Sequence, residues 1–232
     1  MKDRSIVVGE VNTPASDQPQ KKLPPTEGVE TQSSTPAIIE LPELKREPQG
    51  GPEHIDCVEF LNAIFGDNIP QDETILIAKQ VSLGGSFANM TPTSKGFTRA
   101  MRGTRPSAFY FNVSTVAIPP EGTTMRRRKV DCRAAYVVVL DDIGDPNKVS
   151  ELPPVDPSYK METSLGSFQW AYFIEPCEDL DLYDYVIRQL GEMGYTDKGA
   201  GGYNRLFRTP GSANLKPGRD NFRSRITEWH PD

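Results

Sequence analysis

The chain has 232 residues, a net charge of −6 and 36% hydrophobic residues, which is enough to bury a substantial core. It has no apolar run of the roughly 18 residues that a membrane span needs, and its N-terminus lacks the apolar segment of a secretory signal. Cys57, Cys132 and Cys177 are odd in number and widely spaced, which argues against a disulfide framework or a paired-thiol zinc site. We therefore expect a cytoplasmic protein with free thiols and no membrane contact.

The N-terminal stretch differs in composition from the rest of the chain. Residues 1–52 hold eight of the 21 prolines, and the first aromatic residue is Phe60. Without large apolar groups a segment cannot offset the entropy lost on folding. We predict a disordered tail rich in Pro, Gln and Ser at 1–52 and one folded domain at 53–232.

Positive charge is concentrated in two windows of an otherwise acidic chain. Residues 95–133 carry nine Lys or Arg against two acids, and residues 198–225 carry seven against one. Clustered basic side chains favour phosphates. The densest run predicts a nucleic-acid contact and comprises Arg126, Arg127, Arg128 and Lys129. The alternative for this run is an ordinary solvated surface.

The first half of the folded domain reads as a mixture of helices and strands. Apolar residues at intervals of three predict a helix at 53–66, and residues 97–103 are predicted to form a short basic helix. Residues 74–79 and 107–118 have the composition of strands. Tyr110 and Phe111 in the second of these could stack on bases, although aromatic residues in strands more often belong to the core.

The most informative stretch of the chain is a predicted buried strand followed by carboxylates. Residues 135–140 are mostly β-branched or aliphatic, and Asp141 and Asp142 come directly after them. Acids placed where a strand leaves the core suit a divalent metal ion. The alternative is a polar turn that only closes the strand.

The next elements are a predicted β-hairpin and a helix. Residues 158–163 and 168–174 read as strands joined by a glycine-containing turn, and 178–193 read as an amphipathic helix. Alternation places Gln169 on the same face as Ala171 and Phe173. A polar amide on an apolar face needs a partner, either a buried backbone group or a ligand.

The segment 199–218 gathers hydrogen-bond donors on a constrained backbone. Arg205, Arg208, Asn214 and Lys216 lie among glycines and prolines. Arginine forms forked contacts with phosphate oxygens, and lysine adds a compact charge. The segment is suited to a nucleoside triphosphate, and the alternative is an ordinary loop with solvated arginines.

Three of these segments together resemble the successive motifs of phage and plasmid primases. They are Leu140-Asp141-Asp142-Ile143-Gly144, then Glu162-Thr163-Ser164-Leu165-Gly166-Ser167-Phe168-Gln169-Trp170, and then residues 205–218. The family is the replication-protein-B (RepB) type branch of the archaeo-eukaryotic primase superfamily. The resemblance covers roughly residues 105–225, and the order of three motifs makes it more specific than any one of them.

The resemblance implies an α+β fold with an RNA-recognition-motif-like catalytic core. It implies Mg²⁺ or Mn²⁺ at Asp141 and Asp142, and a nucleotide and phosphate site that includes Arg208, Asn214 and Lys216. The implied activity is DNA primase or primase-polymerase activity in a phage or plasmid replication system, in the cytoplasm of a bacterial host. The implied partners are a single-stranded DNA template, nucleoside triphosphates and a replicative helicase on a separate chain.

Two positions depart from the family pattern. The superfamily usually separates its first two carboxylates by one residue, whereas here they are adjacent and Gly144 stands where a further acid is expected, a role that Asp145 could fill. Gln169 takes the place of a histidine, and an amide cannot supply the charge of an imidazolium. Two alternatives therefore stay open: a non-catalytic module that binds single-stranded DNA during replication, and a generic α+β domain.

Overall fold

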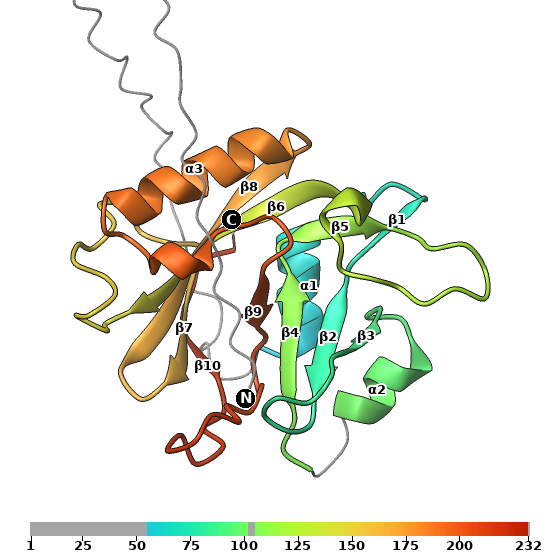
Figure 1. The fold of residues 1–232 in the computed structure, drawn as a ribbon, viewed down its shortest axis with the longest axis horizontal. Coiled ribbons are helices and arrows are strands. Elements are labelled where there is room, and N and C mark those ends of the chain that lie inside the picture. The colour runs from blue at the N-terminus through green and yellow to red at the C-terminus, as the bar shows by residue number, and fades with distance from the viewer. Residues whose placement is uncertain (1–54, 102–104, 232) are drawn as a thin grey trace, which may run out of the picture. The chain divides into compact units, whose positions relative to one another are not determined.

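Two antiparallel β-sheets form the framework of the part of the chain that this computed structural model describes, residues 55–101 and 105–231 (Figure 1). The larger sheet has the strand order β1-β5-β6-β8-β7-β10, and the smaller sheet has the order β3-β2-β4-β9. The larger contains β1 (Glu73–Thr74), β5 (Ser114–Ala117), β6 (Cys132–Ile143), β7 (Tyr159–Ser164), β8 (Ser167–Cys177) and β10 (Arg225–Trp229). The smaller contains β2 (Ile77–Gln80), β3 (Ala88–Met90), β4 (Ala108–Asn112) and β9 (Leu206–Arg208). The tail predicted at 1–52 lies outside the described residues.

The chain passes directly from one sheet to the other, within one or two residues, at two neighbouring points. Only Ile75 and Leu76 separate β1 from β2, and only Val113 separates β4 from β5. The amide of Asn112 donates to the carbonyl oxygen of Leu76 (3.0 Å), which ties the two crossings together. The single strand predicted at 74–79 is therefore divided, because the chain changes sheet within it.

Helix α1 (Cys57–Phe65) packs against both sheets. It begins at Asp56, whose carboxylate accepts hydrogen bonds from the first free amides of the helix, as an N-cap residue does. The ring of Phe60 lies 5.3 Å from the ring of Phe111 in β4 and 5.1 Å from the ring of Tyr159 in β7. Phe60 is fully buried, so its truncation to alanine is expected to cost about 3–5 kcal/mol. Of the two roles considered for Phe111, base stacking and core packing, the structure shows core packing.

Helix α3 (Leu180–Glu192) confirms the amphipathic helix predicted at 178–193 and lies along the larger sheet (Figure 1). The hydroxyl of Tyr183 donates to the carbonyl oxygen of Val137 in β6 (2.9 Å), which fixes the helix on the central strand. A shorter helix, α2 (Lys95–Met101), matches the described part of the helix predicted at 97–103. No helix within the described ranges is long and apolar enough to cross a membrane.

Strands β7 and β8 form the predicted hairpin. Ser164 pairs with Ser167 across the turn, and Gly166 has φ of 71°, a conformation that glycine adopts without strain. Along β8, Gln169 and Ala171 are buried, whereas Phe168 and Trp170 pack into a separate apolar cluster with Leu140 and Ile143 on the other face. The predicted alternation is confirmed. The three cysteines are free thiols, also as predicted.

Candidate active site

Asp141 and Asp142 lie inside strand β6, at a β-bulge. In the pairing of β6 with β8, Leu140 is opposite Trp170 and Ile143 is opposite Phe168. Two residues of β6 therefore oppose the single residue Gln169, and within this bulge Asp142 takes the left-handed conformation (φ 59°). The prediction that the acids follow the end of the strand was wrong, because the bulge lets pairing continue through Ile143.

The bulge brings both carboxylates to one face of the sheet. Gln169 Nε2 donates to Asp141 Oδ1 (3.3 Å), and Ser167 Oγ donates to Asp142 Oδ1 (3.3 Å). Ser167 and Gln169 are two residues apart on β8, so their side chains share a face. In a regular strand two adjacent aspartates would point to opposite faces. The bulge thus gives adjacent acids the arrangement that a one-residue spacing gives in an unbulged strand.

Asp141 is held at its backbone and carries a destabilised negative charge. Its amide donates to Thr196 Oγ1 (2.9 Å), and its carbonyl oxygen accepts from the amide of Asp197 (3.3 Å). Burial of the carboxyl group, reinforced by the charge of Asp142, raises its pKa, against the opposing effects of the Gln169 hydrogen bond and the charge of Arg205. A cation bound between the two carboxylates would relieve this repulsion.

Gln169 is buried with half of its amide unpaired. The residue is 3% exposed, and its Oε1 has no hydrogen-bond partner among the described residues. The partner expected for this amide is therefore the Asp141 carboxylate, which accepts from Nε2, while Oε1 has no partner in the described part of the chain. Buried amide oxygens are nearly always satisfied, so the free Oε1 beside the acid pair is available to accept a hydrogen bond from a ligand or a water molecule.

The oxygen atoms at the bulge fit a magnesium or manganese ion. Two carboxylates lie beside an unpaired amide oxygen, and hard divalent cations prefer such oxygen ligands. No group of three or more Asp, Glu, His or Cys side chains suited to a metal occurs within residues 55–101 and 105–231. Mg²⁺ is commonly held by one or two carboxylates, with water and substrate phosphates completing its shell. The site is therefore suited to an ion that arrives with a phosphate ligand.

Arg208 is a buried cation with neutral partners. It is 7% exposed, at the end of β9, and donates to the carbonyl oxygen of Ala213 (2.8 Å) and to Asn214 Oδ1 (3.1 Å). No ion pair joins it to a carboxylate in the described part of the chain. Burial lowers the pKa of its guanidinium, while the phenol oxygen of Tyr110 and the charge of Asp141 act in the opposite direction. An anionic ligand would compensate this buried charge.

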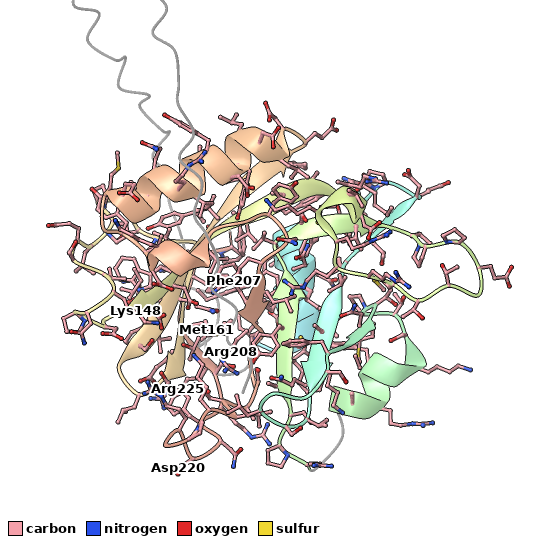
Figure 2. All side chains as sticks on the ribbon, in the orientation of Figure 1. Lys148, Met161, Phe207, Arg208, Asp220 and Arg225 are labelled. Atoms are coloured by element: carbon pink, nitrogen blue, oxygen red, sulfur yellow. The ribbon has the colours of Figure 1, made fainter. Side chains whose placement is uncertain are left out.

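The third predicted motif is joined to the second through Asn214. Its Nδ2 donates to the carbonyl oxygen of Thr163 in β7 (3.1 Å), and its Oδ1 accepts from both Arg208 and the amide of Lys216 (3.3 Å). Figure 2 shows Arg208 in the region between β7 and β4. The Lys216 side chain is exposed beside this network. Arg205 is half-buried, and its charge opposes the rise in the pKa of Asp141.

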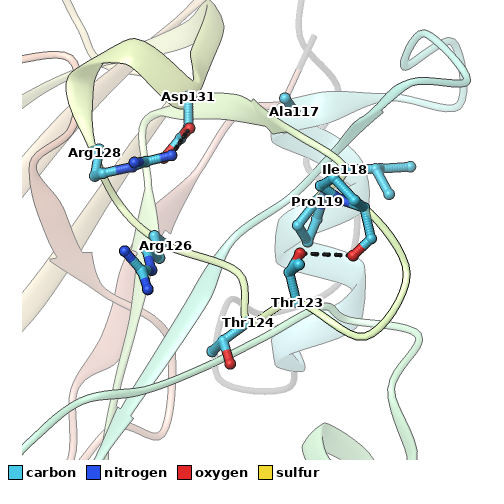
Figure 3. A pocket seen from close by; sticks show the side chains of 9 residues that line it. Ala117, Ile118, Pro119, Thr123, Thr124, Arg126, Arg128 and Asp131 are labelled. Carbon is cyan, nitrogen blue, oxygen red and sulfur yellow. Dashed lines mark hydrogen bonds and ion pairs between the residues drawn. The ribbon is translucent and has the colours of Figure 1, made fainter.

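The basic run Arg126 to Lys129 is mostly engaged within the protein. Arg127 Nη1 donates to the carbonyl oxygen of Asn204 (2.5 Å), next to Arg205. Arg128 forms a forked ion pair with Asp131, and Lys129 pairs with Asp184 (2.9 Å). Arg126 is exposed and lines a cavity of about 310 Å³ with Arg128 (Figure 3). Of the four, Arg126 is therefore the side chain best placed to contact a nucleic acid.

Two side chains at the site were not among the predicted residues. Ser167 was named only as a member of the second motif, and its contact with Asp142 depends on the register of β8. Lys148 Nζ lies 2.5 Å from Asp142 Oδ2. Nothing in the sequence marks Lys148, because a lysine in a loop after a strand is ordinarily solvated. Asp145, considered as a further acid, instead accepts from the amide of Asn147 (3.0 Å) and closes a turn.

The described residues have the fold of a primase catalytic domain, as the three motifs predicted. The chain is similar to the archaeo-eukaryotic primase (AEP) domain of the primase-polymerase from cyanophage S-2L, with a TM-score of 0.55 and 11% identity over 76% of this chain and 90% of that one. Two structures of the primase RepB′ also match at 16% identity. One has a TM-score of 0.47 and covers 74% of this chain and 55% of that chain.

The second RepB′ structure is the catalytic domain in complex with initiator DNA. Its TM-score is 0.46, over 69% of this chain and 79% of that chain. No protein-family model and no curated protein matches the sequence. At these identities the likeness concerns the fold.

Proposed function

We propose that this protein is a metal-dependent nucleotidyltransferase that extends or primes a strand on single-stranded DNA, as a primase or primase-polymerase does. The observation that carries the proposal is the pairing of two opposite features in one region. Two carboxylates share a face at the β6 bulge, and the buried guanidinium of Arg208 has no carboxylate partner in the described chain. A metal–triphosphate complex carries the complementary charges to both.

Each side chain has a defined task in this proposal. Asp141 and Asp142 would hold Mg²⁺ or Mn²⁺, which would supply Lewis-acid assistance to the attack of a 3′-hydroxyl on the α-phosphate and to the departure of pyrophosphate. Arg208 and Lys216 balance the charge of the triphosphate, and Asn214 orients the guanidinium of Arg208. Gln169 holds Asp141 through Nε2 and offers Oε1 to a donor on water or on the nucleotide.

The template is expected to run along basic side chains that remain available to solvent. Arg126 is exposed, and the loop that follows the nucleotide site adds Arg219, which is also exposed. Such residues hold a phosphate backbone without reading its sequence. A helicase on a separate chain stays a prediction.

The test is incorporation of labelled nucleotides on a single-stranded DNA template with Mg²⁺ or Mn²⁺. The variant Asp141→Asn/Asp142→Asn keeps the shape of both side chains and removes their charge. Asp156→Asn is the control, because Asp156 is exposed and lies outside the bulge. We expect products from the wild type and the control and none from the double variant. Products that persist in the double variant would show that the metal assignment is wrong.

The second candidate is a binding module with a primase-like fold and no catalysis. It is favoured by Gln169, which stands where the superfamily has histidine, and by the lack of a third carboxylate at the bulge among the residues that the structure describes. It predicts salt-sensitive binding of single-stranded DNA without incorporation under either metal. Weak primer synthesis by the wild type would exclude it.

A further inference from the structure

A lysine side chain already supplies a cation to the acid pair. Lys148 Nζ lies 2.5 Å from Asp142 Oδ2, while the other oxygen of the same carboxylate accepts from Ser167 Oγ. Asp141 Oδ1 is taken by Gln169. Lys148 and a metal ion bound by the two aspartates would therefore compete for the same atom, Asp142 Oδ2.

The loop that carries Lys148 is fixed by two consecutive turns. The amide of Asp145 donates to the carbonyl oxygen of Asp142 (3.0 Å). The amide of Lys148 donates to the carbonyl oxygen of Asp145 (3.0 Å). The Asp145 carboxylate closes the second turn by accepting from Asn147. Val149, which follows Lys148, is buried against Leu140 and Ile143. The backbone of Lys148 is thus held close to the bulge, and its side chain contacts Asp142 in β6, the strand that precedes the loop.

The side chain itself remains free to leave. Lys148 keeps 40% of its side-chain surface exposed, and Asp142 keeps 24%. A long ammonium-bearing side chain on the rim can move to solvent at a small cost when another cation takes its place. A buried cation such as Arg208, which is 7% exposed, cannot move into solvent in this way.

We propose that Lys148 is an internal counter-ion of the acid pair, which a divalent ion displaces from Asp142 Oδ2 when it binds. The inference rests on the proposed function, since it takes Asp141 and Asp142 as the metal ligands. Lys148 acts through Asp142 and is a positioning residue. It balances the two carboxylates before the metal arrives and sets the metal concentration at which the site fills.

The chain offers a matched control in Lys198. Lys198 Nζ pairs with Glu192 Oε2 at 3.2 Å, and this pair has the same separation of six residues along the sequence as Lys148 and Asp142. Both members of the control pair are largely exposed, at 70% and 62% of their side-chain surface. Lys148→Met and Lys198→Met therefore each remove one ammonium group from one ion pair and change the net charge equally.

The experiment is a titration of the full-length protein with Mn²⁺ alone, followed by the electron paramagnetic resonance signal of free Mn²⁺ at low salt. We expect Lys148→Met to lower the dissociation constant for Mn²⁺ by about fivefold, because the competing cation is gone. Lys148→Arg retains a cation and should stay close to the wild type. Lys198→Met should also match the wild type. An unchanged constant in Lys148→Met, or an equal change in Lys198→Met, would overturn the inference.

Thermal unfolding in a chelator supplies an independent measurement. Lys148→Met should unfold at a lower temperature than Lys198→Met without metal, and Mn²⁺ should raise its midpoint by more than that of the wild type. Equal shifts on adding Mn²⁺ would contradict the counter-ion role. If Lys148→Met does not fold, Lys148→Gln takes its place in both measurements. The double variant Asp141→Asn/Asp142→Asn separates the two proposals: if it binds Mn²⁺ as tightly as the wild type, the metal site itself is refuted.

Discussion

The backbone of Gly144 packs directly against the carbonyl oxygen of Gly166. A Cβ atom on Gly144 would overlap that oxygen, and Gly144 has φ of 98°, which only glycine adopts without strain. Gly144 lies two residues after Asp142, and Gly166 is in the turn of the β7–β8 hairpin. The family pattern expects a further acid at this position. The close approach explains why this chain has none, because any side chain here would separate the hairpin from the bulge.

Gly144→Ala is expected to damage both stability and the site. The overlap and the positive φ together should lower the free energy of unfolding by about 2–4 kcal/mol, and the displaced hairpin should weaken Mn²⁺ binding. Gly84→Ala is the control, since Gly84 has φ of 74° but an added Cβ would meet no atom within 4 Å. Its cost should be about 1–2 kcal/mol with metal binding unchanged. Urea unfolding and Mn²⁺ titration measure the two effects, and equal losses in both variants would argue against the contact.

Arg208→Met should abolish nucleotide binding. The substitution removes the buried charge. It leaves the carbonyl oxygen of Ala213 without this donor and Asn214 Oδ1 with only the Lys216 amide, at a stability cost of about 1–3 kcal/mol. The wild type should unfold at a higher temperature when a nucleoside triphosphate and Mg²⁺ are added, and this increase should vanish in the variant.

Arg133→Met provides the comparison for Arg208→Met. Arg133 is exposed and also donates to carbonyl oxygens, those of Val130 (3.2 Å) and Cys132 (3.1 Å). Without DNA present, its removal should leave the nucleotide-dependent increase in the unfolding temperature intact. A full increase in Arg208→Met would exclude Arg208 from the phosphate site.

Glu162 makes the stability of the hairpin depend on pH. Burial raises the pKa of its carboxyl group, but the hydrogen bond from the Gly166 amide and the guanidinium of Arg225 outweigh burial and hold the pKa below the usual 4.5. A pKa that is lower in the folded state than in the unfolded state stabilises the fold above the unfolded value. That stabilisation is lost as the pH falls through the folded value.

Glu162→Gln should therefore flatten the acid side of the stability profile. The wild type should lose stability as the pH is lowered from about 5 through the folded pKa of Glu162, and the variant should lose less over the same interval. Urea unfolding at a series of pH values measures both profiles. Parallel profiles would indicate that Glu162 titrates alike in the folded and unfolded chains.

Features formed by residues close together in the sequence could be predicted, whereas features formed by residues far apart in the sequence could not. The hairpin at 158–174 and the helix at 178–193 are local, because a glycine turn and a 3.6-residue period specify them. The residues of the candidate site were found from their chemistry and their order along the chain. The bulge was not found, since it depends on the pairing of Asp141 and Asp142 with Gln169, 27 residues beyond Asp142.

The partners of charged side chains were equally beyond the sequence. Lys129 meets Asp184, 55 residues away, and Arg127 meets the carbonyl oxygen of Asn204, 77 residues away. Such contacts follow from tertiary packing and leave no periodic signal. For the same reason Tyr110 could not be assigned: it is half-buried, and the guanidinium of Arg208 lies 5.1 Å from its ring centroid.

The internal ion pairs of the basic run predict unequal roles in DNA binding. Arg126 is exposed and free to contact a phosphate, whereas Arg128 would have to give up its forked pair with Asp131. Each phosphate contact to a single strand contributes about 0.7 to the slope of log K against log salt. Arg126→Ala should therefore weaken binding of single-stranded DNA at low salt and reduce the slope by about 0.7. Arg128→Ala should change both quantities less. Fluorescence anisotropy with a labelled oligonucleotide at several salt concentrations measures both, and a larger effect in Arg128→Ala would mean that the DNA follows a path on which the Arg128 pair opens.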